Sequence, residues 1–383
     1  MKSFFYAGLI GIILIEFLKV YFIMPMPGSQ EINSIDVAYF LYSYRWAYRV
    51  VFILMAVAGS VSVFKVKYKI IPTIFLLFAA VVTWLFNFKM TADKMFLQPE
   101  NVVLKAKPEN KIPVNHIIIG IENNGEAKAY PVGFLAYHHQ VLDTIGGKPV
   151  MVTYCSVCRT GRVFEPIVNG HYEKFRLVGM DHFNAMFEDA TTKSWWRQST
   201  GIAVTGKMKG SILPAVHSRQ MALDKWFELY PQSLVMQPDE ASIVNYDSLA
   251  RFEQGKSKSS LTRTDSLSWK EKSWVVGVWS GNNYKCYDWN YLKKVRIIND
   301  TIGTQPIVLV LSTDGKSFAA FEKPSIDDFT ISHDTIYTYM AAYDFAGNTL
   351  YSNLKPLKAI TAYQEFWHSW RTFHTDTRVY TEK

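Results

Sequence analysis

The sequence predicts an N-terminal membrane region of three helices, followed by a β-rich α+β soluble region made of two duplicated lobes. Two observations lead to this fold class. Three stretches of roughly 20 mostly apolar residues lie near the N-terminus, and this is the length of helix that crosses a bilayer core. After them, a strand-rich segment recurs in the same order at a fixed distance along the chain.

The apolar stretches are Phe4–Ile23, Trp46–Phe64 and Ile70–Phe88. Lys2 precedes the first, as in a signal peptide, but no small-x-small cleavage site follows, so we expect an uncleaved span. Within this span, Glu16 and Lys19 lie three residues apart on one helical face. An ion or proton site is conceivable there, although a local ion pair or snorkelling near the helix end is the simpler interpretation.

The orientation of the spans is predicted from the loop KVKYK at residues 65–69. Basic residues collect on both sides of the spans, so their raw count does not decide. The positive-inside bias acts through short loops, and this loop is compact. We therefore place it in the cytoplasm and everything after Lys89 outside, which makes the protein an integral protein of the cytoplasmic membrane with an extracytoplasmic soluble region.

A net charge of +8 is compatible with binding to nucleic acid. However, the basic residues in the second half of the chain are scattered and form no basic helix or RNA-binding signature. Solubility and attraction to an anionic membrane surface explain the charge equally well. We expect the membrane as a partner and no nucleic acid. Three cysteines in 383 residues do not make a disulfide scaffold.

An internal repeat organises the soluble region. The segment that begins at Ile117 aligns without a gap with the segment that begins at Trp274, at an offset of 157 residues. Eleven positions are identical in this frame, too many for an accidental match. In the first copy they are Gly120, Lys128, Tyr130, Leu135, Asp143, Thr144, Ile145, Gly146, Pro149, Phe164 and Glu165. WFELYPQSLV from Trp226 also resembles WRTFHTDTRV from Trp370.

The repeat predicts two homologous lobes at about Asn115–Asp239 and Ser273–Lys383. Residues 1–91 then hold the three transmembrane helices, residues 92–240 the first lobe, residues 241–272 a polar connecting segment and residues 273–383 a degenerate second lobe. The connecting segment is polar, rich in Ser and Lys and poor in apolar periodicity, so we expect it to link the lobes, either packed over one of them or extending freely. Within each lobe, β-branched runs such as IIIGI and VVGV alternate with Gly-containing turns, and short helices are expected only near GFLAYH and ALDKWFELY.

Cys155 and Cys158 form a Cys-x-x-Cys motif in VTYCSVCRTGRVF. In the repeat they correspond to Ser312 and Gly315, while the surrounding scaffold residues persist. Because one lobe lacks the pair, we interpret the pair as specific to the chemistry of the first lobe. His138 and His139 are likewise replaced, by Val295 and Arg296.

Two cofactor sites are excluded by the neighbours of the motif. A c-type haem needs a histidine directly after the second cysteine, where Arg159 stands, so no haem c is expected. A zinc ribbon needs a second Cys-x-x-Cys, and the remaining cysteine is the lone Cys286. A thiol redox pair, a mixed Cys/His metal site and a local disulfide remain.

For a metal site, the thiolates of Cys155 and Cys158 would fix two corners, and neutral imidazoles would complete it. His139, before the central strand, and His182 in GMDHFNAM are the candidates, with Met180 as a soft ligand. Thiolate with imidazole outside the cytoplasm suits copper best and zinc second.

For thiol–disulfide exchange, a nearby cation such as Arg159 or Arg162 would lower the pKa of one thiol. The motif lacks a thioredoxin-like Trp before it and a βαβ context. A structural disulfide would close only a small loop and add modest stability.

The run HHQVLDTIGGKPVMVTYCSVCRTGRVF resembles the signature of a widespread prokaryotic family, domain of unknown function 3179 (DUF3179), in which a His, a Gly-Gly-x-Pro-Val turn and Thr-Tyr-Cys-x-x-Cys-x-Thr-Gly occur in that order. SWWRQSTGIAVTGKMKGSILP and DKWFELYPQSLVM are similar to two later blocks of that family. The resemblance covers most of the chain after about Asn115. It implies a site but names no reaction.

The positions that match the family signature are His139, Cys155, Cys158, Thr160, Gly161, Trp196, Gln198, Thr200 and Gly201. Of these, the candidates for binding a cofactor beside the cysteines are Thr160, Gly161, Trp196, Gln198 and Thr200. Gln140 stands where a Glu commonly follows the His, and Arg159 where Gly is common, which argues against a carboxylate role next to His139.

The leading hypothesis is a membrane-anchored extracytoplasmic protein whose first lobe holds one Cys/His site. This site binds a transition metal, with copper favoured over zinc, or cycles between thiol and disulfide; its partner would be a small molecule or a redox protein. The alternative is a binding or assembly module, not an enzyme, in which Cys155 and Cys158 form a fixed disulfide.

Overall fold

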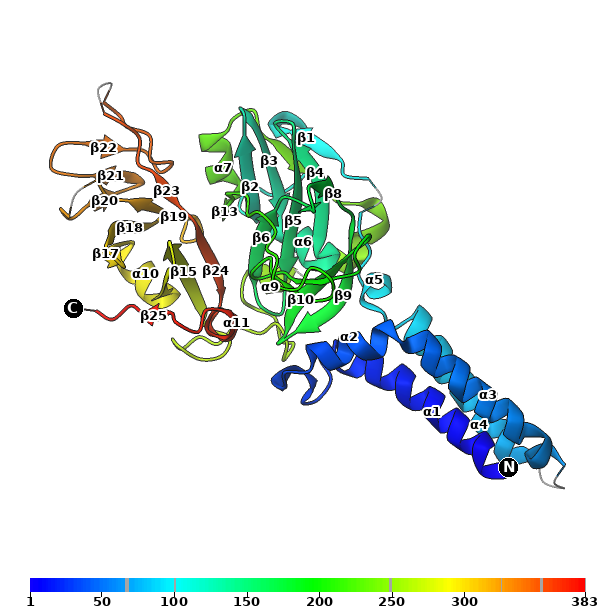
Figure 1. The fold of residues 1–383 in the computed structure, drawn as a ribbon. Coiled ribbons are helices and arrows are strands. Elements are labelled where there is room, and N and C mark those ends of the chain that lie inside the picture. The colour runs from blue at the N-terminus through cyan, green and yellow to red at the C-terminus, as the bar shows by residue number, and fades with distance from the viewer. Residues whose placement is uncertain (66–68, 100, 248–249, 325, 352–353, 383) are drawn as a thin grey trace. The chain divides into compact units, whose positions relative to one another are not determined.

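The computed structural model describes the whole chain except residues 66–68, 100, 248–249, 325, 352–353 and 383 (Figure 1). The loop from which the orientation was predicted therefore lies largely outside the described residues. The chain forms two compact units. Unit one comprises Met1–Leu97, Glu173–Arg197 and Ile202–Ile212, and unit two comprises Gln98–Tyr172, Gln198–Gly201 and Leu213–Lys383.

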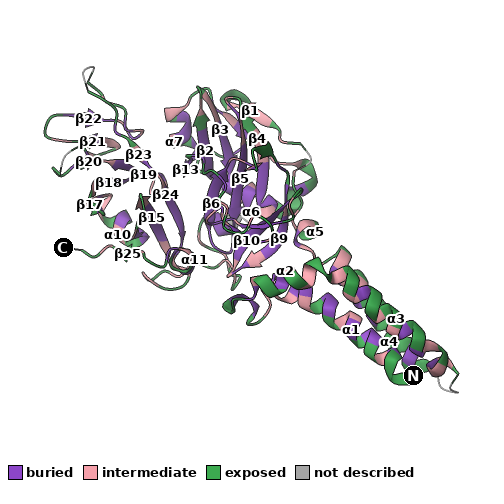
Figure 2. Cartoon of the chain, in the orientation of Figure 1, coloured by how far each residue is buried: buried purple, intermediate pink, exposed green. Residues whose placement is uncertain are grey.

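Unit one contains three helices that are long and apolar enough to span a membrane, as the sequence predicted. Its helices are α1 (Lys2–Tyr21), α2 (Ile35–Ser43), α3 (Arg45–Phe64), α4 (Ile70–Phe88) and α5 (Ala92–Met95). Many apolar side chains of α3 and α4 are exposed, and both helices are largely green in Figure 2. Helix α3 approaches α1 closely at Gly59, where a Cβ would lie 2.3 Å from the backbone nitrogen of Phe5.

A buried polar network joins the three long helices. Glu16 pairs with Lys19 at 2.5 Å and with Arg49 at 2.6 Å, and Asn87 donates to the same carboxylate at 2.8 Å. The local ion pair between Glu16 and Lys19 is therefore confirmed, and it extends across the helices to Arg49. Buried charges in such a bundle are stabilised by pairing, so the network fixes how the helices face one another.

The rest of unit one is a four-stranded sheet in the order β12-β11-β10-β9. The strands are β9 (Phe175–Asp181), β10 (Asn184–Asp189), β11 (Trp195–Arg197) and β12 (Ala203–Thr205). Trp195 from this sheet packs edge-on against Tyr39 of α2, with ring centroids 5.1 Å apart. The end of the first span is attached to β9, because the amide of Met180 donates to the carbonyl of Ile23 at 2.7 Å.

Unit two begins with a first set of elements that contains the Cys-x-x-Cys motif. They are β1 (Leu104–Ala106), β2 (Ile117–Asn123), β3 (Glu126–Pro131), α6 (Val132–His138), β4 (Gln140–Ile145), β5 (Lys148–Cys155), β6 (Thr160–Phe164), β7 (Ile167–Val168), β8 (His171–Tyr172), β13 (Arg219–Ala222), α7 (Leu223–Leu229) and β14 (Leu234–Met236). One sheet has the order β1-β14-β3-β2-β13, and β4-β5-β6 form another. Helices α6 and α7 lie where the sequence predicted short helices.

The second set of elements begins with two strands, a short helix and three strands, the order that β2 to β6 have in the first set. It comprises β15 (Trp274–Ser280), β16 (Asn283–Asp288), α10 (Trp289–Val295), β17 (Ile297–Ile302), β18 (Gln305–Leu311), β19 (Phe318–Glu322), β20 (Thr330–Ser332), β21 (Thr335–Tyr337), β22 (Ala342–Tyr343), β23 (Ala359–Ile360), β24 (Ala362–Phe366), α11 (Trp367–Phe373) and β25 (Arg378–Val379). Its sheets run β24-β15-β16-β25, β17-β18-β19-β23 and β20-β21-β22. Together with unit one, this makes a β-rich α+β fold of several sheets that follows three long apolar helices in the sequence.

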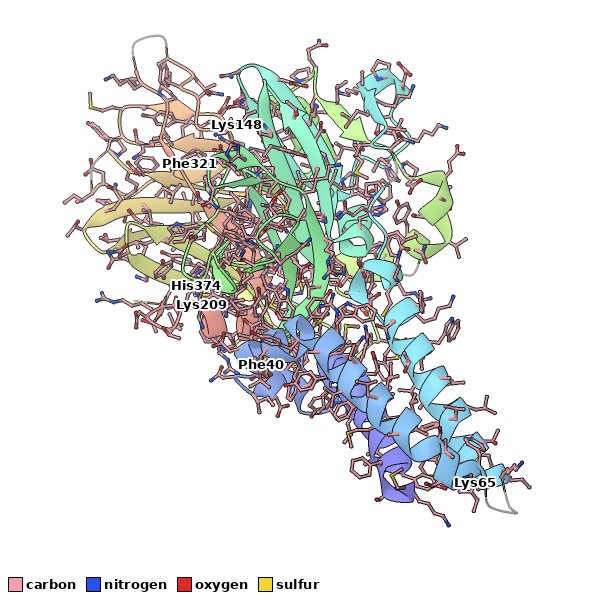
Figure 3. The ribbon with its side chains drawn as sticks, turned by 45° about the vertical axis from the view of Figure 1, so that its right-hand side comes forward. Phe40, Lys65, Lys148, Lys209, Phe321 and His374 are labelled. Carbon is pink, nitrogen blue, oxygen red and sulfur yellow. The ribbon has the colours of Figure 1, made fainter. Side chains whose placement is uncertain are left out.

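Contacts also recur at equivalent positions of the two sets. Trp226 donates to Ser233 at 2.7 Å, and Trp370 donates to Thr377 at 2.8 Å. Gly201 and Gly347 both have positive φ. A Cβ on Gly201 would lie 2.6 Å from the ring of Phe164, and a Cβ on Gly347 would lie 2.6 Å from the ring of Phe321, which is labelled in Figure 3. These recurrences support the predicted duplication, which stays a prediction.

The polar connecting segment packs over the first set. It contains the short helices α8 (Ile243–Asp247) and α9 (Ala250–Glu253). Phe252 is buried in the core with Tyr154, and the carboxylate of Glu253 accepts from the amide of Ile117 at 2.7 Å. The segment therefore packs against the first set, while the predicted division of the chain into lobes and a connecting segment stays a prediction.

Candidate functional site

The two cysteines of the motif lie at a hairpin between β5 and β6. Cys155 is the last residue of β5 and pairs with Thr160, so the intervening turn holds four residues. Arg159 closes the turn with φ of 57°. Both cysteines are free thiols, fully buried, and their side chains hydrogen-bond to each other. The hairpin thus holds two sulfur atoms side by side in the protein interior.

The second set of elements and the end of the connecting segment cover this turn. The amide of Phe366 donates to the carbonyl of Cys158 at 2.9 Å. The ammonium of Lys272 donates to the carbonyl of Val157 at 2.7 Å and lies 3.1 Å from Nε2 of His368. Nε2 of His368 also lies 3.3 Å from the carbonyl of Val157, so the imidazole and the ammonium approach the same carbonyl. Elements more than 100 positions apart in the sequence therefore meet at one turn.

Burial raises the pKa of the Cys158 thiol well above its usual value, and the hydrogen bond with Cys155 acts in the same direction. The positive charge of Lys272 and the hydroxyl of Ser369 oppose this rise. A hydrogen bond that favours the protonated form is one that Cys158 donates. In this hydrogen bond the sulfur of Cys155 is the acceptor.

Burial also changes the two basic groups beside the sulfur atoms. It lowers the pKa of Lys272, while the charges of Cys158 and Cys155 raise it again. Burial and the charge of Lys272 lower the pKa of His368 to about 3. At neutral pH, His368 is therefore uncharged, and Lys272 is the cation that faces the cysteines.

The two arginines after the motif have other contacts. Arg159 is fully buried, lies 3.6 Å over the ring of Trp274 and donates to the carbonyl of Glu253 at 3.0 Å. Arg162 pairs with Glu365 at 2.5 Å. The cation that opposes the rise in the pKa of Cys158 is Lys272, and not one of the arginines that sequence proximity suggested. The arginines tie the turn to neighbouring elements.

His139 is held in one orientation beneath the hairpin. It ends α6 with φ of 61°, and Nδ1 lies 2.9 Å from the carbonyl of Tyr154. A carbonyl oxygen only accepts, so Nδ1 carries the proton and Nε2 keeps its lone pair. Burial lowers the pKa of His139 to about 4, so the imidazole is neutral. Arg296 has the same φ at the equivalent position, so the backbone conformation does not depend on histidine.

Gln198 and Thr160 brace the hairpin. The hydroxyl of Thr160 donates to Oε1 of Gln198 at 2.6 Å, and Nε2 of Gln198 donates to the carbonyl of Thr160 at 3.0 Å and to Thr153 at 3.1 Å. Gly161 lies where a Cβ would be 2.7 Å from Ile119. These contacts are structural, while a cofactor-binding role for Thr160, Gly161, Gln198 and Thr200 stays a prediction.

Two predicted site residues, Trp196 and His182, belong to unit one. The indole of Trp196 donates to Asp189 at 2.9 Å. Nδ1 of His182 lies 2.6 Å from the carboxylate of Asp181, which also pairs with Arg197. Within unit one, His182 therefore belongs to an ion-pair cluster, and Trp196 to the sheet.

A metal ion needs several donors close together. Among the described residues, no group of three or more His, Cys, Asp or Glu side chains could hold one. The four predicted ligands, Cys155, Cys158, His139 and His182, are therefore not seen as one group, and their assignment to a metal stays a prediction. A tetrahedral zinc site has less support here than a site that needs only the two sulfur atoms.

The sequence analysis missed Lys272, His368 and Ser369. Lys272 lies in the polar connecting segment, and the other two follow strand β24. The related signal in the sequence was the similarity between the segments that begin at Trp226 and at Trp370. This similarity indicated a closing helix but did not single out Lys272, His368 or Ser369.

Comparison with known proteins gives one result. A family model described as a protein of unknown function (DUF3179) matches residues 98–377. No curated protein matches the chain, and no solved structure does.

Proposed function

Since the chain belongs to the DUF3179 family, whose description names no reaction, we propose a function from its site: it is a membrane-anchored extracytoplasmic protein whose Cys155–Cys158 dithiol exchanges with disulfides. One observation carries the proposal. The two thiols hydrogen-bond to each other beside the ammonium of Lys272, whose positive charge opposes the rise that burial causes in the pKa of Cys158.

In the proposed reaction, the thiolate of Cys155 attacks one sulfur of a partner disulfide and releases the other partner sulfur as a thiolate. Cys158 then loses its proton and attacks the sulfur of Cys155 in the mixed disulfide, which releases the second partner thiolate. The dithiol loses two electrons, and the partner disulfide gains them. Because both cysteines are buried, the exchange requires local opening of the segment that covers the turn.

A fixed structural disulfide has less support. In the second set, the equivalent turn has no cysteine, and the side chain of Asp314 accepts from the amides of Lys316 at 2.7 Å and Ser317 at 2.8 Å. This fold therefore closes the turn with ordinary hydrogen bonds, and a covalent clip is not needed for it.

A second candidate is a copper(I) site formed by the two thiolates. Soft thiolates select Cu(I), and such a site does not need the third donor that a larger cluster would supply. The positive charge of Lys272 would offset the negative charge of a bis-thiolate. Zinc would need further ligands from outside this pair.

The test uses the full chain in detergent. Thiol titration across a series of dithiothreitol redox buffers should show two thiols that are lost and regained together, and Cys158→Ser should trap a mixed disulfide at Cys155. Cys286→Ser is the matched control, because Cys286 is also a buried free thiol but lies in β16. Titration with Cu(I) follows on the same variants. Thiols that neither cycle nor bind copper would contradict both candidates and favour the disulfide or assembly module.

A further inference from the structure

Unit one contains a cavity that the cysteine chemistry does not use. Its volume is about 320 Å³, within the ~300–1,000 Å³ range of ligand pockets. Residues of α1, α3 and α5, of strand β9 and of the end of α4 line it. Helix α1 ends at Tyr21, α3 begins at Arg45 and α4 ends at Phe88, so the cavity lies at one common end of the three helices.

The cavity is strongly basic. Its basic lining residues are Lys19, Arg45, Arg49, Lys94 and Arg176, and Asp93 is the one carboxylate among the described residues that line it. Two of the cations are held by Glu16, and Arg176 is held by Glu188 at 2.9 Å. These pairs orient part of the basic lining without filling the cavity.

Arg45 and Lys94 remain without a carboxylate partner among the described residues. Arg45 donates to the carbonyl of Tyr42 at 2.5 Å, and its guanidinium stacks 3.9 Å over the ring of the same residue. Lys94 is exposed at the end of the short helix α5. The cavity therefore carries an excess of positive charge that its own residues do not neutralise.

Most of the remaining lining is apolar, with Val20, Met24, Trp46 and Met90 among its residues, and Tyr42, Asn87 and Thr91 add polar groups. A cavity with a basic part and an apolar part, at the end of membrane-length helices, matches an amphiphile whose charged head lies at the membrane surface. Arginine binds phosphate through two parallel hydrogen bonds, and lysine adds a point charge. We propose that this cavity binds a phosphate group, carried either by a membrane phospholipid or by a soluble phosphate compound.

Native mass spectrometry of the full chain in detergent tests the proposal with three probes. They are dioctanoyl phosphatidylglycerol, dioctanoylglycerol, which has the same chains without phosphate, and inorganic phosphate. The double variant Arg45→Gln/Lys94→Gln removes the unpaired charges and leaves the Glu16 network intact. The matched control is Lys65→Gln/Lys69→Gln, which removes two exposed charges at the opposite end of the helices (Lys65 is labelled in Figure 3).

We expect phosphatidylglycerol to bind the native chain and the control equally, and the cavity variant at least tenfold more weakly. Displacement of the lipid by inorganic phosphate would identify a soluble phosphate compound as the ligand, and failure to displace it would identify the lipid. Arg45→Glu provides a second variant that should abolish binding. Equal binding of dioctanoylglycerol, or unchanged binding in both cavity variants with native thermal stability, would overturn the proposal.

Discussion

The buried pair between Arg162 and Glu365 should hold the cover over the cysteine turn. Arg162 follows the motif in β6, and Glu365 lies in β24, directly before the residues that reach Cys158. The charged atoms are 2.5 Å apart, and the two side chains are 3% and 0% exposed. The guanidinium also stacks 3.8 Å over the ring of Tyr363. Removal of Arg162 would therefore leave a carboxylate buried without its counter-charge.

The expected cost follows from this burial. Removing one partner of a buried pair destabilises a protein by about 3–5 kcal/mol, because the remaining charge stays desolvated. We therefore expect Arg162→Met to lower the free energy of unfolding by about 4 kcal/mol. The double variant Arg162→Met/Glu365→Met should recover most of this loss, since replacing a whole buried pair with apolar side chains is often close to neutral.

Two measurements check this prediction on the full chain in detergent. Urea unfolding followed by circular dichroism gives the stability, and the rate of maleimide labelling reports access to the cysteines, which should rise in Arg162→Met. Lys358→Met is the control, because Lys358 pairs with Glu322 on the surface, where a pair contributes about 0–1 kcal/mol. A loss below about 1 kcal/mol for Arg162→Met, or a double variant as unstable as the single one, would refute the reasoning.

Three further predictions follow from other contacts. Lys272→Met should raise the pKa of Cys158 further and move the pH profile of thiol alkylation upward by about one unit; an unchanged profile would contradict the role of this cation. The pKa of His139 is about 4 in the fold instead of 6.5, so its burial as a neutral imidazole should contribute fully to the free energy of unfolding above pH 6.5. This free energy should fall by about 3 kcal/mol as the pH drops to 4. His139→Asn, which tolerates positive φ, should lose less of it when urea unfolding is measured at each pH. Gly277→Ala should cost about 1–3 kcal/mol in thermal unfolding, because its Cβ would lie 1.9 Å from a buried indole, while Gly133→Ala, with nothing within 4 Å, should be neutral or stabilising.

The membrane-length helices could be predicted because their signal is local. A run of about 20 apolar residues is sufficient to specify such a helix, whatever the rest of the chain does. The same holds for the short helices α6 and α7 and for the Gly-containing turns, which depend on neighbouring residues. The ion pair of Glu16 and Lys19 was also predicted from their spacing, whereas the participation of Arg49 was not, because it comes from another helix.

The cysteine motif could be identified as a candidate site from the sequence, but its environment could not. Proximity in the sequence favoured Arg159 and Arg162 as the cations beside the thiols, yet their side chains turn to Trp274 and Glu365. A side chain that follows a strand can point to either side of the hairpin, and only the packing of the other elements decides which.

The sequence by itself therefore determined the three apolar helices, the first strands and turns of each lobe, the Cys-x-x-Cys motif as a candidate site and the membership of the DUF3179 family. Only the tertiary structure brought Lys272, His368 and Ser369 to the turn that holds the cysteines. The physical reason is one of range. Helices and turns depend on interactions within a few residues, whereas the charge and solvation of a buried thiol depend on whichever side chains the completed fold packs against it.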